Sequence, residues 1–337
     1  SRNSGEDMGD LAMQKHLKKH SFTLWLLLGV ILAILFPSYG SKGGLLCPEL
    51  TTNIGVWLIF FLQGIALPTS ELTKGYNPKR LHAFVLFWNY IIFPIIVGAL
   101  LLPISHVINE ELKIGFWMLA ILPTTVSSAV VFSTVSKGNT PNAIFSTVFS
   151  NLLSVILVPT VVITYLTIES NLSIPLSPLF SKLFILIIAP LLFGQLFRQK
   201  VPKVSVFMAN RTKGFGNWII VFIVHCAFAQ SVSSGFLVQL GFITIFKVIF
   251  LTVLILLLVS FLVWWSSVFI NLSKEQRISA FFCSSQKSIA TGLPLITSIL
   301  AFAPSVTDTA SIIIPLMCYH PAQLILAGIL SGWWGSK

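Results

Sequence analysis

Charged residues are scarce in this chain of 337 residues. Asp, Glu, Lys and Arg together make up 9% of it, and hydrophobic residues make up 55%, whereas a soluble globular protein carries about 25% charged residues. Cysteine is scarce as well, and the four that occur show neither CxxC nor metal-ligand spacing: Cys47, Cys226, Cys283 and Cys318. The shortage of charge excludes an ordinary soluble domain and indicates a membrane protein that crosses the bilayer several times.

Acidic side chains are missing from the depth of the apolar segments. All ten Asp and Glu residues lie between these segments or at their ends. A His–Ser pair at membrane depth would therefore have no acid to orient it, and we expect no enzyme. The net charge is +11, but the basic residues form no stripe of the kind that binds nucleic acid.

Long apolar runs, bounded by Pro, Gly and charge, recur along the whole chain. A helix needs about 20 residues to cross a bilayer, and runs of this length are too long for barrel strands. The sequence predicts an all-α membrane protein with ten spans, after a cytoplasmic segment 1–20: 21–37, 52–70, 81–104, 114–136, 140–167, 177–198, 212–236, 242–270, 277–301 and 306–333.

The basic residues between the spans predict the orientation. Sixteen Lys and Arg fall on one side, four fall on the other, and Lys287 is left within a span. Because cytoplasmic loops carry the excess of basic residues, both termini should be cytoplasmic. We expect an integral protein of a bacterial inner membrane, with a eukaryotic plasma or secretory-pathway membrane as the alternative.

The second half of the chain repeats the spacing of the first. An offset of about 157 residues places the starts of the first four spans near the starts of spans six to nine. A unit of five spans enters from the opposite side when it is repeated, so 21–167 and 177–333 form an inverted repeat, as in many transporters.

Matching spans four and nine are both interrupted by polar residues and proline. Span four contains Pro123 to Ser128, and span nine contains Ser284 to Ser288. Transporters with inverted repeats bind their solutes between such broken helices at the membrane midplane. Candidate binding residues at or near the breaks are Ser127, Ser128, Ser284, Ser285, Gln286, Lys287 and His320.

Lys287 is the strongest single candidate because a charge at membrane depth is costly and usually functional. The alternative is that its long stem carries the ammonium to the interface. Removal from water disfavours the charged form of a lysine, so proton coupling through Lys287 is a further expectation. Hydroxyl groups in membrane helices often only bond to their own backbone, which is the structural alternative for the serines.

The order of several short motifs resembles the bile acid:sodium symporter superfamily, and most closely its orphan branch, which contains the seventh member of solute carrier family 10 with yeast and bacterial relatives. The motifs are Phe61 to Gly64, Pro123 to Ser128, Phe282 to Ser284, Lys287-Ser288 and Tyr319 to Gln323. The resemblance implies a core domain of spans three to five and eight to ten, which moves against a panel of spans one, two, six and seven. It also places ion- and substrate-binding polar residues at Asn89, Thr147, Asn151 and Gln286.

Three positions depart from the symporter pattern. The glutamate that the symporters share between two sodium sites falls at Phe282, and two asparagines fall at Ala129 and Lys287. Hard cations prefer anionic or carbonyl oxygen ligands, so we expect neither the two-sodium site nor any other cofactor.

Together these features predict a secondary transporter of a small organic anion. Lys287 would supply a built-in positive charge at the crossing of the broken helices, and half-helix N-termini would add positive potential. The alternative is a membrane regulator that transports nothing and controls calcium influx through a partner channel.

Overall fold

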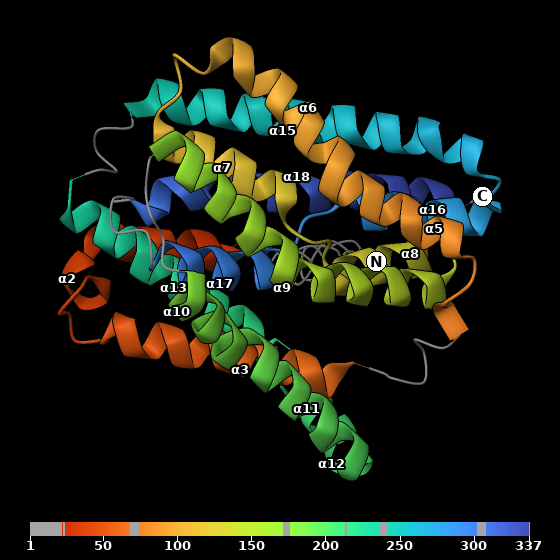
Figure 1. Ribbon diagram of the computed structural model, residues 1–337, viewed down its shortest axis with the longest axis horizontal. Helices are drawn as coiled ribbons and strands as arrows, with labels where there is room; N and C mark the ends of the chain where they lie inside the picture. The colour runs from red at the N-terminus through yellow and green to blue at the C-terminus, as the bar shows by residue number, and fades with distance from the viewer. Residues whose placement is uncertain are drawn as a thin grey trace, which may run out of the picture.

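The computed structural model describes residues 22, 24–67, 74–170, 176–212, 214–235, 241–301 and 308–336. Every regular element among these residues is a helix, as Figure 1 shows. The all-helical class predicted from the apolar runs is therefore confirmed. The predicted cytoplasmic segment 1–20 lies outside the described residues.

The helices of the first half begin and end close to the predicted spans. A short apolar helix, Leu24–Leu35, comes first. The others are α2 (Pro37–Gly40), α3 (Pro48–Ala66), α5 (Lys79–Phe87), η1 (Trp88–Ile92), α6 (Phe93–Leu101), η2 (Leu102–Ile104), α7 (Glu110–Ile121), α8 (Val126–Val135) and α9 (Thr140–Ser170). The element η1 is a π-helical turn inside the continuous helix 79–104.

The second half contains one helix that the apolar pattern did not predict. This is α12 (Pro202–Arg211), which is short and carries basic residues. The others are α10 (Leu176–Leu183), η3 (Phe184–Ile188), α11 (Ala189–Lys200), α13 (Phe215–Ser233), α15 (Gly241–Ser266), η4 (Ser267–Ile270), α16 (Lys274–Ser285), α17 (Ile289–Leu300) and α18 (Thr309–Gly335).

Seven helices of the described chain are long and apolar enough to cross a membrane. The pair α7 and α8, bent by 52°, makes an eighth if it is one broken span. The helix Leu24–Leu35 is apolar but short. The pair α16 and α17 is not among the helices that are long and apolar enough to cross. The chain is thus an integral membrane protein, and the count of ten spans stays a prediction.

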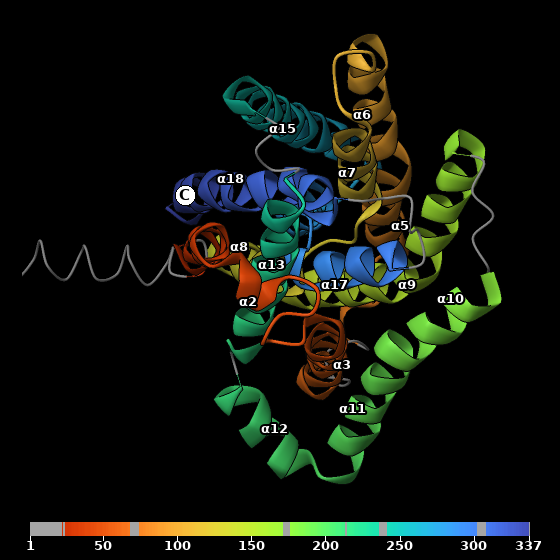
Figure 2. The ribbon, with the colours of Figure 1, turned by 90° about the vertical axis from the view of Figure 1, so that its left-hand side faces the viewer.

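The helices pack in two groups. One contains α3, which lies against α11, α12 and α13. The other contains α16, which lies against α5, α8, α9 and α15, and α18, which lies against α7 and α15. Figures 1 and 2 both show α3 and α15 on opposite sides of the molecule. The helices α17 and α18 contact α13, so these elements lie where the two groups meet.

Glycine permits the closest contact within the first group. A Cβ atom on Gly64 of α3 would lie 2.3 Å from the Leu191 carbonyl oxygen, and one on Gly194 of α11 would lie 2.3 Å from that of Phe61. Close approach of backbones through small residues is the usual way in which membrane helices associate, because the lipid provides no hydrophobic driving force between them. We expect α3 and α11 to move as one unit.

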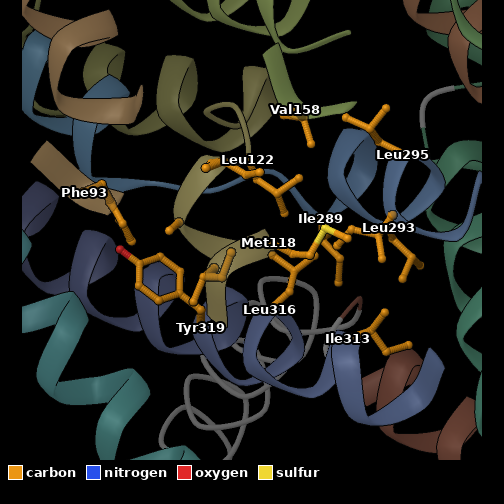
Figure 3. Close-up of a cluster of buried hydrophobic side chains, with 14 of the residues drawn as sticks. Phe93, Met118, Leu122, Val158, Ile289, Leu293, Leu295, Ile313, Leu316 and Tyr319 are labelled. Carbon is orange, nitrogen blue, oxygen red and sulfur yellow. The ribbon is translucent and has the colours of Figure 1, made fainter. Parts of the chain in front are cut away.

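Apolar side chains fill the space behind the two helix breaks. Figure 3 shows Phe93 beside Tyr319, and Met118 near Leu122 and Ile289. The rings of Phe93 and Tyr319 meet edge to face with their centroids 5.8 Å apart.

Candidate functional site

Two interrupted helices meet near the contact between the two groups. Residues 122–125 separate α7 from α8, and residues 286–288 separate α16 from α17. Both breaks were predicted from the polar and proline pattern and are confirmed. Pro123 favours an extended conformation at Leu122, which ends α7. The amide N of Ser288 donates to the Pro123 carbonyl oxygen at 2.9 Å, so the two breaks are in direct contact.

Lys287 is fully buried and points away from solvent. Its Nζ donates to the carbonyl oxygens of Leu122 at 2.8 Å, Ala120 at 2.9 Å and Asn89 at 3.2 Å. The same nitrogen lies 4.1 Å from the ring centroid of Phe93. The ammonium therefore does not reach the interface, and carbonyl dipoles with an aromatic face offset its burial.

The carbonyl oxygens that hold Lys287 are free for a local structural reason. The last four carbonyls of a helix have no partner within it, and α7 ends at Ile121. The C-terminal end of a helix is also the negative end of its dipole, which favours a cation there. Asn89 lies in the π-helical turn η1, and such turns commonly occur at functional sites.

Helix α18 holds the second break in place. The Gln323 side chain accepts from the Lys287 amide N at 2.7 Å and donates to the Lys287 carbonyl oxygen at 2.9 Å. The Tyr319 hydroxyl donates to the Ser285 carbonyl oxygen at 2.7 Å. The candidate His320 contacts Gln323, whose Nε2 lies 3.1 Å from Nδ1 of the ring. His320 thus supports the break through Gln323.

Further polar side chains surround the contact between the two breaks, which is called the crossing below. Ser128 Oγ donates to Gln286 Oε1 at 2.7 Å, and Asn89 Nδ2 donates to the Cys283 carbonyl oxygen at 3.0 Å. Asn89 Oδ1, Gln286 Nε2 and Ser284 Oγ are buried without a partner among the described residues. These groups have hydrogen-bonding capacity to offer, which is unusual for buried polar atoms.

Asn151 of α9 connects the two breaks from the other side. Its Nδ2 donates to the carbonyl oxygens of Thr124 and Thr147, both at 2.7 Å. Its Oδ1 accepts from Thr291 Oγ1 at 2.6 Å. The candidate Thr147 bonds with its own hydroxyl to the Ile144 carbonyl oxygen, as expected for a helix hydroxyl without a ligand role.

A cavity of about 470 Å³ lies where the two groups of helices meet. Both half-helices begin at its wall, which contains the N-cap Thr125 with Val126 and Ser127 of α8, and the N-cap Ser288 with Ala290 and Thr291 of α17. Asn151, Gln63 and Asn217 add polar groups, and no Asp or Glu lies among the described lining residues. The remaining wall is largely aliphatic, from α3, α8, α9, α11 and α13.

The predicted residues thus divide into three sets. Ser127 and Asn151 line the cavity. Lys287, Gln286, Ser128, Ser284, Asn89 and His320 surround the crossing but do not line the cavity in this conformation. Ser285 lies next to the second break, and its hydroxyl donates to the Phe281 carbonyl oxygen in its own helix. Thr147 lies outside the cavity wall.

Sequence reasoning named neither Gln323 nor Thr291 as a site residue. Gln323 lies three residues after His320, so helical spacing puts both on one face of α18. Thr291 lies one turn after Ser288 and donates its amide N to the Ser288 hydroxyl at 3.1 Å. A search for polar residues one helical turn from the second break and from His320 would have found both.

Two of the three positions that depart from the symporter pattern, Phe282 and Ala129, are apolar. Phe282 is fully buried in an aromatic cluster, with its ring 5.9 Å from that of Phe132 and 5.6 Å from that of Trp334. Ala129 is fully buried too. The described residues contain no group of three or more His, Cys, Asp or Glu that could hold a metal ion. A sodium site built on a shared carboxylate does not fit these residues.

An all-helical membrane protein with a solute-sized cavity at the contact of two broken helices has the features of a membrane transporter. Residues 20–335 match the SBF-like CPA transporter family, so the chain belongs to that family. The resemblance drawn from the motifs is confirmed.

Curated relatives cover nearly the whole chain. The sodium/bile acid cotransporter 7-B of Xenopus laevis is 30% identical over 327 residues, which cover 95% of this chain and 93% of that protein. The sodium/bile acid cotransporter 7 of Mus musculus is 30% identical, with 91% of each chain covered. An uncharacterised protein of Pseudomonas aeruginosa is 30% identical, with 92% of this chain and 91% of that protein covered. The family therefore spans bacteria and vertebrates.

Proposed function

We propose that this protein is a secondary active transporter that moves a small amphipathic organic anion by alternating access. One observation carries the proposal. The N-termini of α8 and α17 both lie at the wall of one cavity, and no acidic residue is found among the described residues that line it. Each helix N-terminus carries roughly half a positive charge and free N–H donors, which together bind anions.

The Lys287 ammonium adds to this positive potential from behind the crossing. It is next to Ser288, which lines the cavity, while its side chain points to α7 and η1. In a low-dielectric interior a charge acts over a longer distance than in water. Lys287 therefore favours an anion in the cavity without touching it.

The aliphatic wall favours a solute with an apolar body. Leu62, Val130, Val148 and Leu191 are among the lining residues, and polar groups are concentrated near the two half-helix N-termini. Binding sites of this kind orient a ligand by a few polar groups and bury the rest of it against hydrocarbon. A steroid or aryl acid has this distribution of polarity, and two relatives carry the name sodium/bile acid cotransporter.

The proposed transport cycle uses the ten-helix inverted repeat, with units 21–167 and 177–333. Helices α3, α11 and α13 would belong to the panel, and helices α8, α9 and α17 to the core. Since the cavity lies between these sets, movement of one against the other would open it to alternate sides of the membrane. Both termini would be cytoplasmic. Coupling to a proton rather than to sodium is part of the proposal.

Uptake into liposomes that contain the purified protein tests the proposal. We expect a radiolabelled bile acid or aryl sulfonate to enter faster than into protein-free liposomes, and a pH gradient to drive the uptake without sodium. Uptake equal to that of protein-free liposomes for carboxylates, sulfonates and sulfates alike would contradict it. A regulator of calcium influx would give that result and would alter calcium entry in cells.

A further inference from the structure

The Lys287 ammonium lies in a shell of neutral ligands. Three backbone carbonyl oxygens, from Leu122, Ala120 and Asn89, accept its N–H groups at 2.8 to 3.2 Å, and the Phe93 ring centroid lies 4.1 Å from Nζ. An ammonium has three N–H donors, and the shell offers three carbonyl acceptors. Carbonyl oxygens also bind K⁺, and aromatic faces also attract small ammonium ions.

The shell does not depend on the lysine for its construction. Pro123 ends α7 and thereby frees the Ala120 and Leu122 carbonyls, and the π-helical turn presents the Asn89 carbonyl. Close packing fixes the first break as well, since a Cβ atom on Gly292 would lie 2.5 Å from Leu122 Cδ1. The ligands therefore remain in place when the side chain is shortened.

The ammonium also joins elements that are distant in sequence. Asn89 belongs to the helix 79–104, Ala120 and Leu122 lie at the end of α7, and Lys287 lies between α16 and α17. If the three helices move apart, the ammonium loses its carbonyl acceptors and the carbonyls lose their donor. Both are then buried polar groups without a hydrogen bond, which is costly. The occupied site thus stabilises the relative positions of three helices at the crossing.

We propose that Lys287 is a covalently attached occupant of a monovalent-cation site. Removing its side chain creates a site that binds free ammonium or K⁺. This inference rests on the proposed transport function in one respect. In the wild-type protein the two helix breaks stay in contact through the transport cycle without binding a free cation here, because the Lys287 ammonium already occupies the site.

The test compares the thermal unfolding of purified Lys287→Ala in choline, ammonium, potassium and sodium chloride at one ionic strength. We expect ammonium and potassium to raise the unfolding midpoint saturably, by about 2 °C at ten times the dissociation constant. Sodium should act more weakly, because contacts of 2.8 to 3.2 Å suit the larger ions. The wild type and Lys287→Met, which keeps an apolar stem in the shell, should not respond, and neither should Lys274→Ala, an exposed lysine of α16.

Four results would overturn the proposal. Lys287→Ala could unfold at the same temperature in all four salts. Lys287→Met could show the same rise as Lys287→Ala. Lys287→Gln could be as stable as the wild type, which would mean that neutral donors suffice. Lys287→Ala could also fail to fold in every salt, whereas recovery of folded protein by ammonium supports the site. These measurements use no solute, so a failure of the transport function would leave this result unaffected.

Discussion

The Gln323 side chain pairs with both backbone polar groups of Lys287, through its Oε1 at 2.7 Å and its Nε2 at 2.9 Å. This pairing satisfies the amide and the carbonyl that the break between α16 and α17 leaves without helical partners. It also holds the Lys287 backbone, from which the side chain reaches the carbonyl oxygens at the end of α7. Helix α18 therefore sets the position of the charge.

Replacing Gln323 with Leu should destabilise the protein without a change of fold. The substitution leaves the buried amide and carbonyl of Lys287 unpaired, at a cost of about 3 kcal/mol in the free energy of unfolding. A drop in the unfolding midpoint measured on purified protein checks this. Gln199→Leu changes an exposed residue of α11 and is the matched control. Equal midpoints for the two variants would show that the pairing does not stabilise the break.

Thr291→Val should weaken solute binding. Valine has the shape of threonine but removes the hydroxyl that donates to Asn151 Oδ1 at 2.6 Å in the cavity wall. We expect the KM for uptake to rise by about tenfold, since a lost hydrogen bond with a reoriented amide costs about 1.4 kcal/mol. Thr297→Val in the same helix, where the hydroxyl bonds only to the Pro294 carbonyl oxygen, is the control. If both variants gave the same KM, the Asn151–Thr291 pair would have no part in binding.

Ser127→Asp should abolish binding of an anion and leave the protein folded. Ser127 lines the cavity in the first turn of α8, where a carboxylate stabilises the helix by about 0.3 to 1 kcal/mol. The same carboxylate repels an anionic solute. Ser127→Asn is the neutral control, and size-exclusion profiles of both variants report folding. Anion uptake by Ser127→Asp at the rate of Ser127→Asn would argue against an anion beside α8.

The orientation can be tested with reporters. A reporter fused after Lys337 should be active in the cytoplasm, and one inserted in the loop 105–109 should be active outside. The prediction rests on sixteen basic residues on one side against four on the other. The reverse pattern of reporter activity would mean that the assumed order of spans is wrong.

Much of the fold followed from the sequence because the bilayer restricts what an apolar run can form. The breaks at Pro123 and Gln286 were visible because proline and consecutive polar residues are rare within a span. Helix α12 was not predicted, since it is short and carries Lys203 and Arg211 among apolar residues. This helix packs against α3 and α11. The contact with α3, which is distant in sequence, cannot be read from the spacing of apolar residues within 202–211.

The site was less predictable than the fold. The burial of Lys287 followed from its position in an apolar run, but its direction did not. In an extended break no helical period relates one residue to the next, so neighbouring side chains point to different places. Ser288 therefore faces the cavity while Lys287 points to the end of α7. The partners of Lys287 are backbone carbonyls, which the identity of the residues does not reveal.

The central claim is that the cavity holds an organic anion at two helix N-termini. The most direct measurement compares the binding of three compounds with one aromatic body, naphthalene-2-sulfonate, 2-naphthalenemethanol and (2-naphthylmethyl)trimethylammonium, by calorimetry on the purified protein. The account predicts that the sulfonate binds about tenfold more tightly than the alcohol, that the cation binds most weakly, and that Ser127→Asp removes the preference. A cation that binds the wild type as tightly as the sulfonate does would contradict the account.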